Sequence, residues 1–458
     1  MQHSFRNGRA RQTVSLLLIF QLVFSPLYSS LALAGTLTVD SSAASAHQPS
    51  LDTAGNGVPI VQITAPSASG VSLNKYGQLN IDSNGLILNN SQLITKTQLG
   101  GYIEGNTNLL GSNGARIIVN QVNGGLPSAL NGYAEVAGQQ AEVIIANPGG
   151  ITCNGCGFIN TNRGVLTTGA VVLDSGGAID NISVNQGVLQ VNGKGLNASN
   201  IDQLDLLARA IEINAEIHGQ QVNMVTGTNR VDYSDLSISK IEGVGDAPSL
   251  SLDVSALGGM YADRIFMVGT EKGVGVNSEG VIAAGGSGLI LTAEGDIRLK
   301  NSHSASTTSL TSTEGDIELV GDHFSQHSMS LSAGETVVIG GDVGAKGNLA
   351  VSSEQLTVND SGTLSAGYDE AGLMSHGGTL DIKTGVMLNK GSVVSQDIRV
   401  MAQQFENIGA VAQAGDGDFN ITVDANVQNS GTLSATKQLS INTAQYDNSD
   451  GTAVSRGE

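Results

Sequence analysis

The chain has 458 residues, with 61 glycines, 7 prolines, no tryptophan and only 3% aromatic residues. A core must therefore be built from Val, Ile, Leu and Ala, which suit short stacked strands. The formal net charge of −20 disfavours nucleic acid and anionic lipid as partners and is typical of a well-solvated secreted surface.

The first 34 residues are typical of an export signal. Three arginines precede an apolar run over residues 14–24, and small residues at Ala32 and Ala34 favour cleavage between Ala34 and Gly35. Because this run is short and interrupted, a retained membrane anchor is the weaker alternative. Once the signal is removed, no further run is long enough to predict a stable membrane span.

Short apolar runs bounded by Asn and Gly follow, and they predict strands and turns. One stretch is ambiguous. Residues 200–215 carry a leucine stripe that suits a helix, but their alternating isoleucines suit two strands equally well.

The second half of the chain repeats itself. Glu-Gly-Asp-Ile occurs at residues 294–297 and again at 314–317, and Asn-x-Gly units begin at Asn389, Asn407 and Asn429. Periods near 20 residues indicate coils of a right-handed parallel β-helix, an all-β solenoid. The recurring Asn and Gly are expected to turn each coil, often with positive φ. An N-terminal cap over residues 35–76 would protect the first coil's edge, whereas no cap is evident before Glu458, which favours a longer rod or a truncated product.

Several segments resemble the secretion domain of filamentous-haemagglutinin-type exoproteins of two-partner secretion systems. The resemblance extends over residues 35–280 and includes the variety with a Cys-x-x-Cys motif. The segments that carry it are Val58–Ile63, Asn106–Leu109, Gly132–Val136, Ala141–Ile151, Cys153–Asn160, Gly258–Ala262 and Gly269–Val276.

Two short motifs within this resemblance are candidate sites for transporter recognition or for turn formation. They consist of Asn106, Asn108 and Leu109 in the first motif, and Asn147, Pro148, Gly150 and Ile151 in the second. Thr107 and Gly149 depart from the family pattern, but both residues are compatible with turns. Turn formation is the favoured interpretation.

Cys153 and Cys156 are the chain's only cysteines. They are candidates for a disulfide, a redox pair or half of a metal site. Export into an oxidising compartment favours a structural bridge, and two cysteines alone are a poor zinc site.

No arrangement of residues predicts catalysis, a cofactor or a metal site. His323 and His327 are four residues apart but lack the glutamate of a zinc-protease motif, so surface histidines are the favoured interpretation. A polysaccharide-active β-helical enzyme remains an alternative, although basic residues are sparse in the repeats. A passive secreted remnant is another.

The N-terminal pattern predicts a signal peptide at residues 1–34, the resemblance implies a secretion domain at 35–275, and the repeats predict the start of a rod at 276–458. It implies export through the periplasm by a dedicated outer-membrane transporter of the Omp85 type, to the medium or the cell surface. The exported protein would act as an adhesin or haemagglutinin, or as the N-terminal rod of a contact-dependent growth inhibition effector. Its receptor on a host or neighbouring cell is not indicated.

Overall fold

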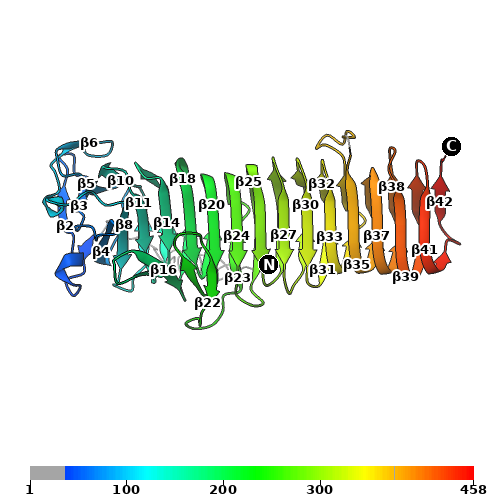
Figure 1. Ribbon diagram of the computed structural model, residues 1–458, viewed down its shortest axis with the longest axis horizontal. Coiled ribbons are helices and arrows are strands. Elements are labelled where there is room, and N and C mark those ends of the chain that lie inside the picture. Colours follow the sequence, from blue (N-terminus) through cyan, green and yellow to red (C-terminus); the bar gives the residue numbers. More distant parts are fainter. Residues whose placement is uncertain (1–36, 376, 458) are drawn as a thin grey trace, which may run out of the picture. The chain divides into compact units, whose positions relative to one another are not determined.

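A computed structural model describes residues 37–375 and 377–457. The expected signal peptide and its cleavage site between Ala34 and Gly35 lie outside the described residues. Within them the chain is a parallel β-solenoid, in which each coil pairs with the coil before and the coil after it (Figure 1). The predicted parallel β-helix is confirmed.

Three rows of parallel strands form the walls of the solenoid. The first row contains β3 (Pro59–Gln62), β5 (Leu86–Asn90), β10 (Tyr133–Gly138), β13 (Cys156–Ile159), β29 (His323–Ser325), β32 (Asp342–Ala345), β34 (Thr363–Ala366), β36 (Ser392–Ser395), β38 (Ala410–Gln413), β40 (Thr432–Ala435) and β42 (Thr452–Ser455). The second row contains β4 (Val71–Gln78), β8 (Ile117–Val122), β11 (Glu142–Ala146), β14 (Arg163–Thr167), β27 (Thr308–Ser312) and β30 (Met329–Ala333). The third row contains β9 (Ser128–Leu130), β12 (Ile151–Cys153), β17 (Val188–Val191), β19 (Ala210–Ile213), β23 (Leu250–Val254), β28 (Ile317–Leu319) and β31 (Thr336–Ile339).

Longer strands bend through the corners and contribute to more than one row. They are β18 (Leu196–Ala208), β20 (Glu216–Thr226), β24 (Gly259–Gly269), β25 (Gly275–Ala293), β26 (Ile297–Ser304), β33 (Leu349–Val358), β35 (Thr379–Asn389), β37 (Asp397–Asn407), β39 (Phe419–Asn429) and β41 (Leu439–Asp447). The ambiguous stretch at residues 200–215 therefore belongs to strands β18 and β19. Its isoleucines and most of its leucines point into one continuous core of stacked aliphatic side chains, whereas Leu207 lies in a second, separate core.

The N-terminal cap is built from irregular elements. β1 (Thr38–Val39) pairs antiparallel with β4, and β2 (Ser50–Thr53) pairs antiparallel with β3. A short 3-10 helix, η1 (Ser45–His47), lies between them. At the other end, all four residues of β42 are exposed.

Two further features project from the coils and had no signal in the repeats. One is a four-stranded antiparallel sheet of β15 (Ala170–Leu173), β16 (Ile179–Val184), β21 (Asn229–Asp232) and β22 (Ile238–Lys240). Its apolar residues pack against the solenoid wall in a second core that includes Val119, Ile144 and Ile182. The other feature is a hairpin of β6 (Thr95–Thr97) and β7 (Gly101–Ile103).

The repeated aspartates tie neighbouring coils together. Asp296 Oδ1 accepts a hydrogen bond from the backbone N–H of Asp316 at 3.0 Å, and Asp316 Oδ1 accepts one from Thr336 at 2.8 Å. The Glu-Gly-Asp-Ile repeat thus places a carboxylate where the next coil has an N–H that needs an acceptor.

The repeated asparagines lie inside the corners where β35, β37 and β39 end. Asn389 Nδ2 donates to Asn407 Oδ1 at 2.7 Å, and Asn407 Nδ2 donates to Asn429 Oδ1 at 2.7 Å. We call Asn389, Asn407, Asn429 and Asn448 the asparagine ladder. All but Asn448 are buried.

The expected positive φ at these repeats was wrong. The glycines two residues after the first three ladder asparagines, Gly391, Gly409 and Gly431, all have ordinary φ. A Cβ on Gly409 would lie 2.1 Å from the carbonyl oxygen of Gly391. Glycine is required there because adjacent coils approach closely, not because the backbone is left-handed.

Candidate functional site

The second candidate motif forms a buried turn between β11 and β12. The side chain of Asn147 is fully buried. Its Oδ1 accepts a hydrogen bond from Gly149 N at 2.8 Å, and its Nδ2 donates to Leu126 O and Ser128 Oγ, both at 2.9 Å. The amide is fully used within the fold, so it offers no free group to a partner of the folded domain.

The residues that follow Asn147 complete the same turn. Gly150 has φ of +110° and donates its N–H to the carbonyl of Asn147 at 3.0 Å. An L side chain rarely adopts this φ, so glycine is required. Pro148 is half-buried, and Ile151 starts β12 with its side chain in the core. The turn thereby carries the chain from the second row to the third.

The first candidate motif is built in the same way. η2 (Thr107–Leu109) begins after Asn106, whose Oδ1 accepts a hydrogen bond from Asn108 N at 2.9 Å. Asn106 Nδ2 donates to the carbonyls of Ile63 and Asn89, both at 2.9 Å, and the side chain is fully buried. Asn108 itself is exposed, whereas Leu109 is fully buried in the core. In each motif, the buried asparagine side chain thus forms hydrogen bonds to nearby backbone groups of the fold.

Cys153 and Cys156 are joined by a disulfide, with their Cα atoms 5.4 Å apart. Cys153 ends β12 and Cys156 begins β13, so the bridge spans the corner between the third row and the first. Both side chains are buried.

A buried polar cluster, absent from the sequence-based predictions, ties the four-stranded sheet to the solenoid. Arg163 Nε donates to Asp205 Oδ2 at 2.7 Å, and its Nη1 donates to the carbonyl of Tyr233 at 2.8 Å. The guanidinium carbon lies 4.1 Å from the centre of the Tyr233 ring, whose hydroxyl bonds Glu142. Burial opposes the charge of Arg163, but the neighbouring anions outweigh it and raise its pKa.

A second ion pair fastens the loop after β22. Arg209 Nη2 lies 2.7 Å from Glu271 Oε1, and its Nη1 donates to the carbonyl of Val244 at 2.7 Å. Hydrogen bonding to Glu271 raises the pKa of Arg209. Asp205 and Arg209 each stand inside an apolar run of the sequence. A charged residue inside an apolar run is the sequence feature from which these buried ion pairs could have been predicted.

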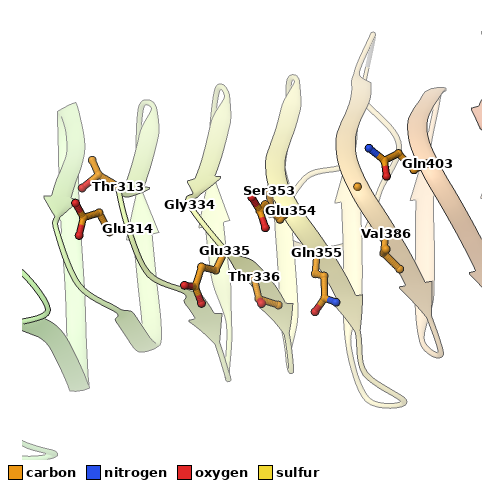
Figure 2. A pocket seen from close by; sticks show the side chains of 11 residues that line it. Thr313, Glu314, Gly334, Glu335, Thr336, Ser353, Glu354, Gln355, Val386 and Gln403 are labelled. Atoms are coloured by element: carbon orange, nitrogen blue, oxygen red, sulfur yellow. The ribbon is translucent and has the colours of Figure 1, made fainter. Parts of the chain in front are cut away.

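A groove of about 830 Å³ follows one corner of the repeat region (Figure 2). Glu314, Glu335 and Glu354 line it from successive coils, and Lys272 Nζ lies 3.0 Å from Glu314 Oε2. Its described lining residues include no Lys or Arg. The basic side chains that the enzyme alternative would place beside these carboxylates are thus not among the lining residues.

The histidine prediction was half wrong. His327 is exposed, as expected, but His323 is buried within β29 and its Nδ1 lies 2.8 Å from Ser302 Oγ. Burial, and to a lesser extent His303, lowers its pKa to about 4. Among residues 37–375 and 377–457, no group of three or more His, Cys, Asp or Glu side chains is arranged to hold a metal ion.

Comparison with known proteins identifies the first part of the solenoid. Residues 35–299 match the family model of the TPS secretion domain. The chain is 39% identical over 379 residues to the tRNA nuclease CdiA of Yersinia mollaretii, covering 81% of this chain and 12% of that protein. It is 34% identical over 432 residues to the 16S rRNA endonuclease CdiA of Enterobacter cloacae, covering 87% of this chain and 13% of that protein. A crystal structure of the filamentous haemagglutinin secretion domain aligns with a TM-score of 0.53 and 26% identity, covering 70% of this chain and 96% of that one.

The solenoid, its cap and its asparagine-fixed turns define the secretion domain of an exported β-helical protein. The chain belongs to the two-partner secretion family, and it is an exoprotein of that family. It spans only about an eighth of the length of the two CdiA relatives. In the part of the chain that the structure describes, no helix is both long and apolar enough to cross a membrane.

Proposed function

We propose that this chain is the exported N-terminal part of a contact-dependent growth inhibition effector. The observation that carries the proposal is the match to two CdiA proteins over more than four-fifths of this chain. The nuclease names of those relatives describe whole proteins about seven times as long as this chain. The role assigned to residues 1–458 is therefore secretion and extension of a rod, without enzymatic activity of their own.

The partner in export is a dedicated outer-membrane transporter of the Omp85 type. Residues 1–34 direct the chain to the periplasm, residues 35–275 engage the transporter, and residues 276–458 begin the repeat rod. The Cys153–Cys156 bridge forms in the oxidising periplasm. The product is released or held at the cell surface.

The two asparagine motifs act through folding. Asn106 and Asn147 are buried, and all of their side-chain groups bond within the fold. A transporter that read these amides directly would have to do so before the coils form. In the unfolded chain, an extended segment pairs with a sheet edge of the transporter by strand addition. The emerging coils then stack on one another outside the cell, which opposes backward movement.

The adhesin or haemagglutinin function is the second candidate, supported by the structural similarity to the haemagglutinin secretion domain. That similarity concerns the secretion domain, which both kinds of exoprotein share. Binding of the purified protein to host cells, measured against binding to neighbouring bacteria, separates the two candidates. Binding to neither surface would favour the passive remnant.

Secretion of residues 1–458 into the medium, with and without the co-expressed cognate transporter, tests the proposal. We expect release only with the transporter, and loss of release for the double variant Asn147→Ala, Pro148→Ala. Asn113→Ala, at an exposed asparagine, is the matched control and should be released normally. Release without the transporter would overturn the export proposal.

A refolding measurement separates folding from direct recognition. If the motif acts through folding, the purified Asn147→Ala protein refolds from urea more slowly or unfolds at lower urea concentration. A variant with unchanged stability and refolding that is nevertheless not secreted would assign Asn147 to direct recognition.

A further inference from the structure

One coil of the repeat region carries a long projecting loop. β36 and β37 are joined by the single residue Gln396, whereas β34 and β35 are joined by a longer loop, whose described residues are 367–375 and 377–378. In Figure 1 this loop projects beside β32 in yellow and orange. Its ends are fixed, because Gln396 Nε2 donates to Gly367 O at 3.3 Å and Ser375 Oγ donates to Lys346 O at 2.7 Å.

The loop folds back over the outer face of the preceding coils. Glu370 Oε1 lies 3.4 Å from His303 Nδ1, although His303 is on β26, three strands earlier in the first row. The loop and the outer faces of β29, β32 and β34 together line a half-open cavity of about 450 Å³. This volume is in the range of small-molecule sites.

The floor of the cavity is hollow because of one glycine. Phe324, Gly344 and Ser365 are in register on adjacent strands. A Cβ on Gly344 would lie 2.7 Å from Ser365 Oγ and 3.5 Å from the Phe324 ring. Any side chain at this position would therefore occupy the space between its two neighbours.

The walls combine aromatic rings with negative charge. Phe324 and Tyr368 contribute rings. The carboxylates are those of Asp322, Asp342, Asp369 and Glu370. His303 and His323 also line the cavity, and the described lining residues include no Lys or Arg. Such a lining repels anions, and aromatic faces flanked by carboxylates attract organic cations through cation–π and charge-assisted contacts. We propose that this cavity binds a small organic ammonium ion, which goes beyond the secretion function.

Two sources share this chemistry, a free amine and a lysine side chain. Calorimetry on the secreted protein at low salt, with 1,5-diaminopentane and with Nα-acetyl-lysine amide as separate probes, distinguishes them. We expect saturable binding in the millimolar range or tighter. Preference for the diamine indicates a free amine, and preference for the lysine derivative indicates a protein partner. Glucose serves as the neutral probe and should not bind.

Variants connect any binding to this cavity. Gly344→Val fills the floor and should abolish binding, and Glu370→Gln should weaken it about tenfold. Glu354→Gln, in the separate groove of Figure 2, should leave it unchanged. Because Glu370 lies on an exposed loop, its variant remains informative even if Gly344→Val fails to fold.

Three results would overturn the proposal. The first is that neither amine gives saturable binding, and the second is that Glu370→Gln binds as tightly as wild type. The third is that glucose binds as well as the amines, which would make the cavity a saccharide site.

Discussion

The asparagine ladder gives the sharpest test of how the repeat region is stabilised. Replacing Asn407 by alanine removes an inner member of the ladder. Its Oδ1 accepts from Asn389 Nδ2, and its Nδ2 donates to Asn429 Oδ1, both at 2.7 Å inside a buried corner. Each lost bond removes about 1 kcal/mol, and a buried group left without a partner costs about 1–3 kcal/mol. Because Asn389 Nδ2 retains a second acceptor, Ala410 O at 3.2 Å, we expect a total loss of about 3 kcal/mol.

The loss should be local, because a solenoid coil contacts only its neighbours. Urea unfolding combined with amide hydrogen exchange should show lower protection in β35, β37 and β39, with the secretion domain unchanged. Asn448→Ala is the matched control, because Asn448 is half-exposed at the end of the ladder and water can replace its contact, so it should lose less than about 1 kcal/mol. Equal losses for the two variants would refute the argument that burial of the ladder determines its contribution.

Three further predictions concern other parts of the solenoid. Burial holds His323 neutral, with a pKa of about 4. Because the unfolded state takes up the proton near pH 6.5, the free energy of unfolding should fall by about 3 kcal/mol between pH 6.5 and 4. Urea titrations at these pH values should show a smaller fall for His323→Val. Gly409→Ala should lower the free energy of unfolding by about 1–3 kcal/mol, because its Cβ would meet the preceding coil. Gly55→Ala is the control: Gly55 has open space around it, so this variant should change the urea midpoint little. Arg209→Met should lower the free energy of unfolding by about 3 kcal/mol, because it leaves Glu271 unpaired. Limited proteolysis should then cut the loop after β22 sooner than in the wild type. Unchanged cutting would mean that the ion pair does not hold the loop.

The solenoid could be predicted from the sequence repeats because each repeated residue makes the same contact once in every coil. Asp296 and Asp316 are the same residue type because each satisfies an N–H of the next coil. The asparagines were correctly placed at corners, but their role was not predictable. An inward amide ladder and an outward turn have the same spacing in the sequence.

The antiparallel sheet and the projecting loop were not predictable for a different reason. Ile182 and Val231 alternate with polar residues as any solenoid strand does, and pattern alone does not state which partner a strand will pair with. His323 was misplaced because its neighbours in the row, Ser302 and Val343, are distant in sequence. The two asparagine motifs were located from the family resemblance, while their burial required the coordinates. Their proposed role, like the domain boundaries, stays a prediction.

The four-stranded sheet sets a minimum length for a stable exported segment. β15 pairs with β16, but β16 pairs in turn with β21, which begins only at Asn229, and the sheet is complete only at Lys240. When a chain crosses a membrane from its N-terminus, the early coils lack the complete four-stranded sheet until about half of the described residues have emerged. Shorter exported segments should therefore remain protease-sensitive and able to slide back, and protection should appear abruptly once Lys240 has passed.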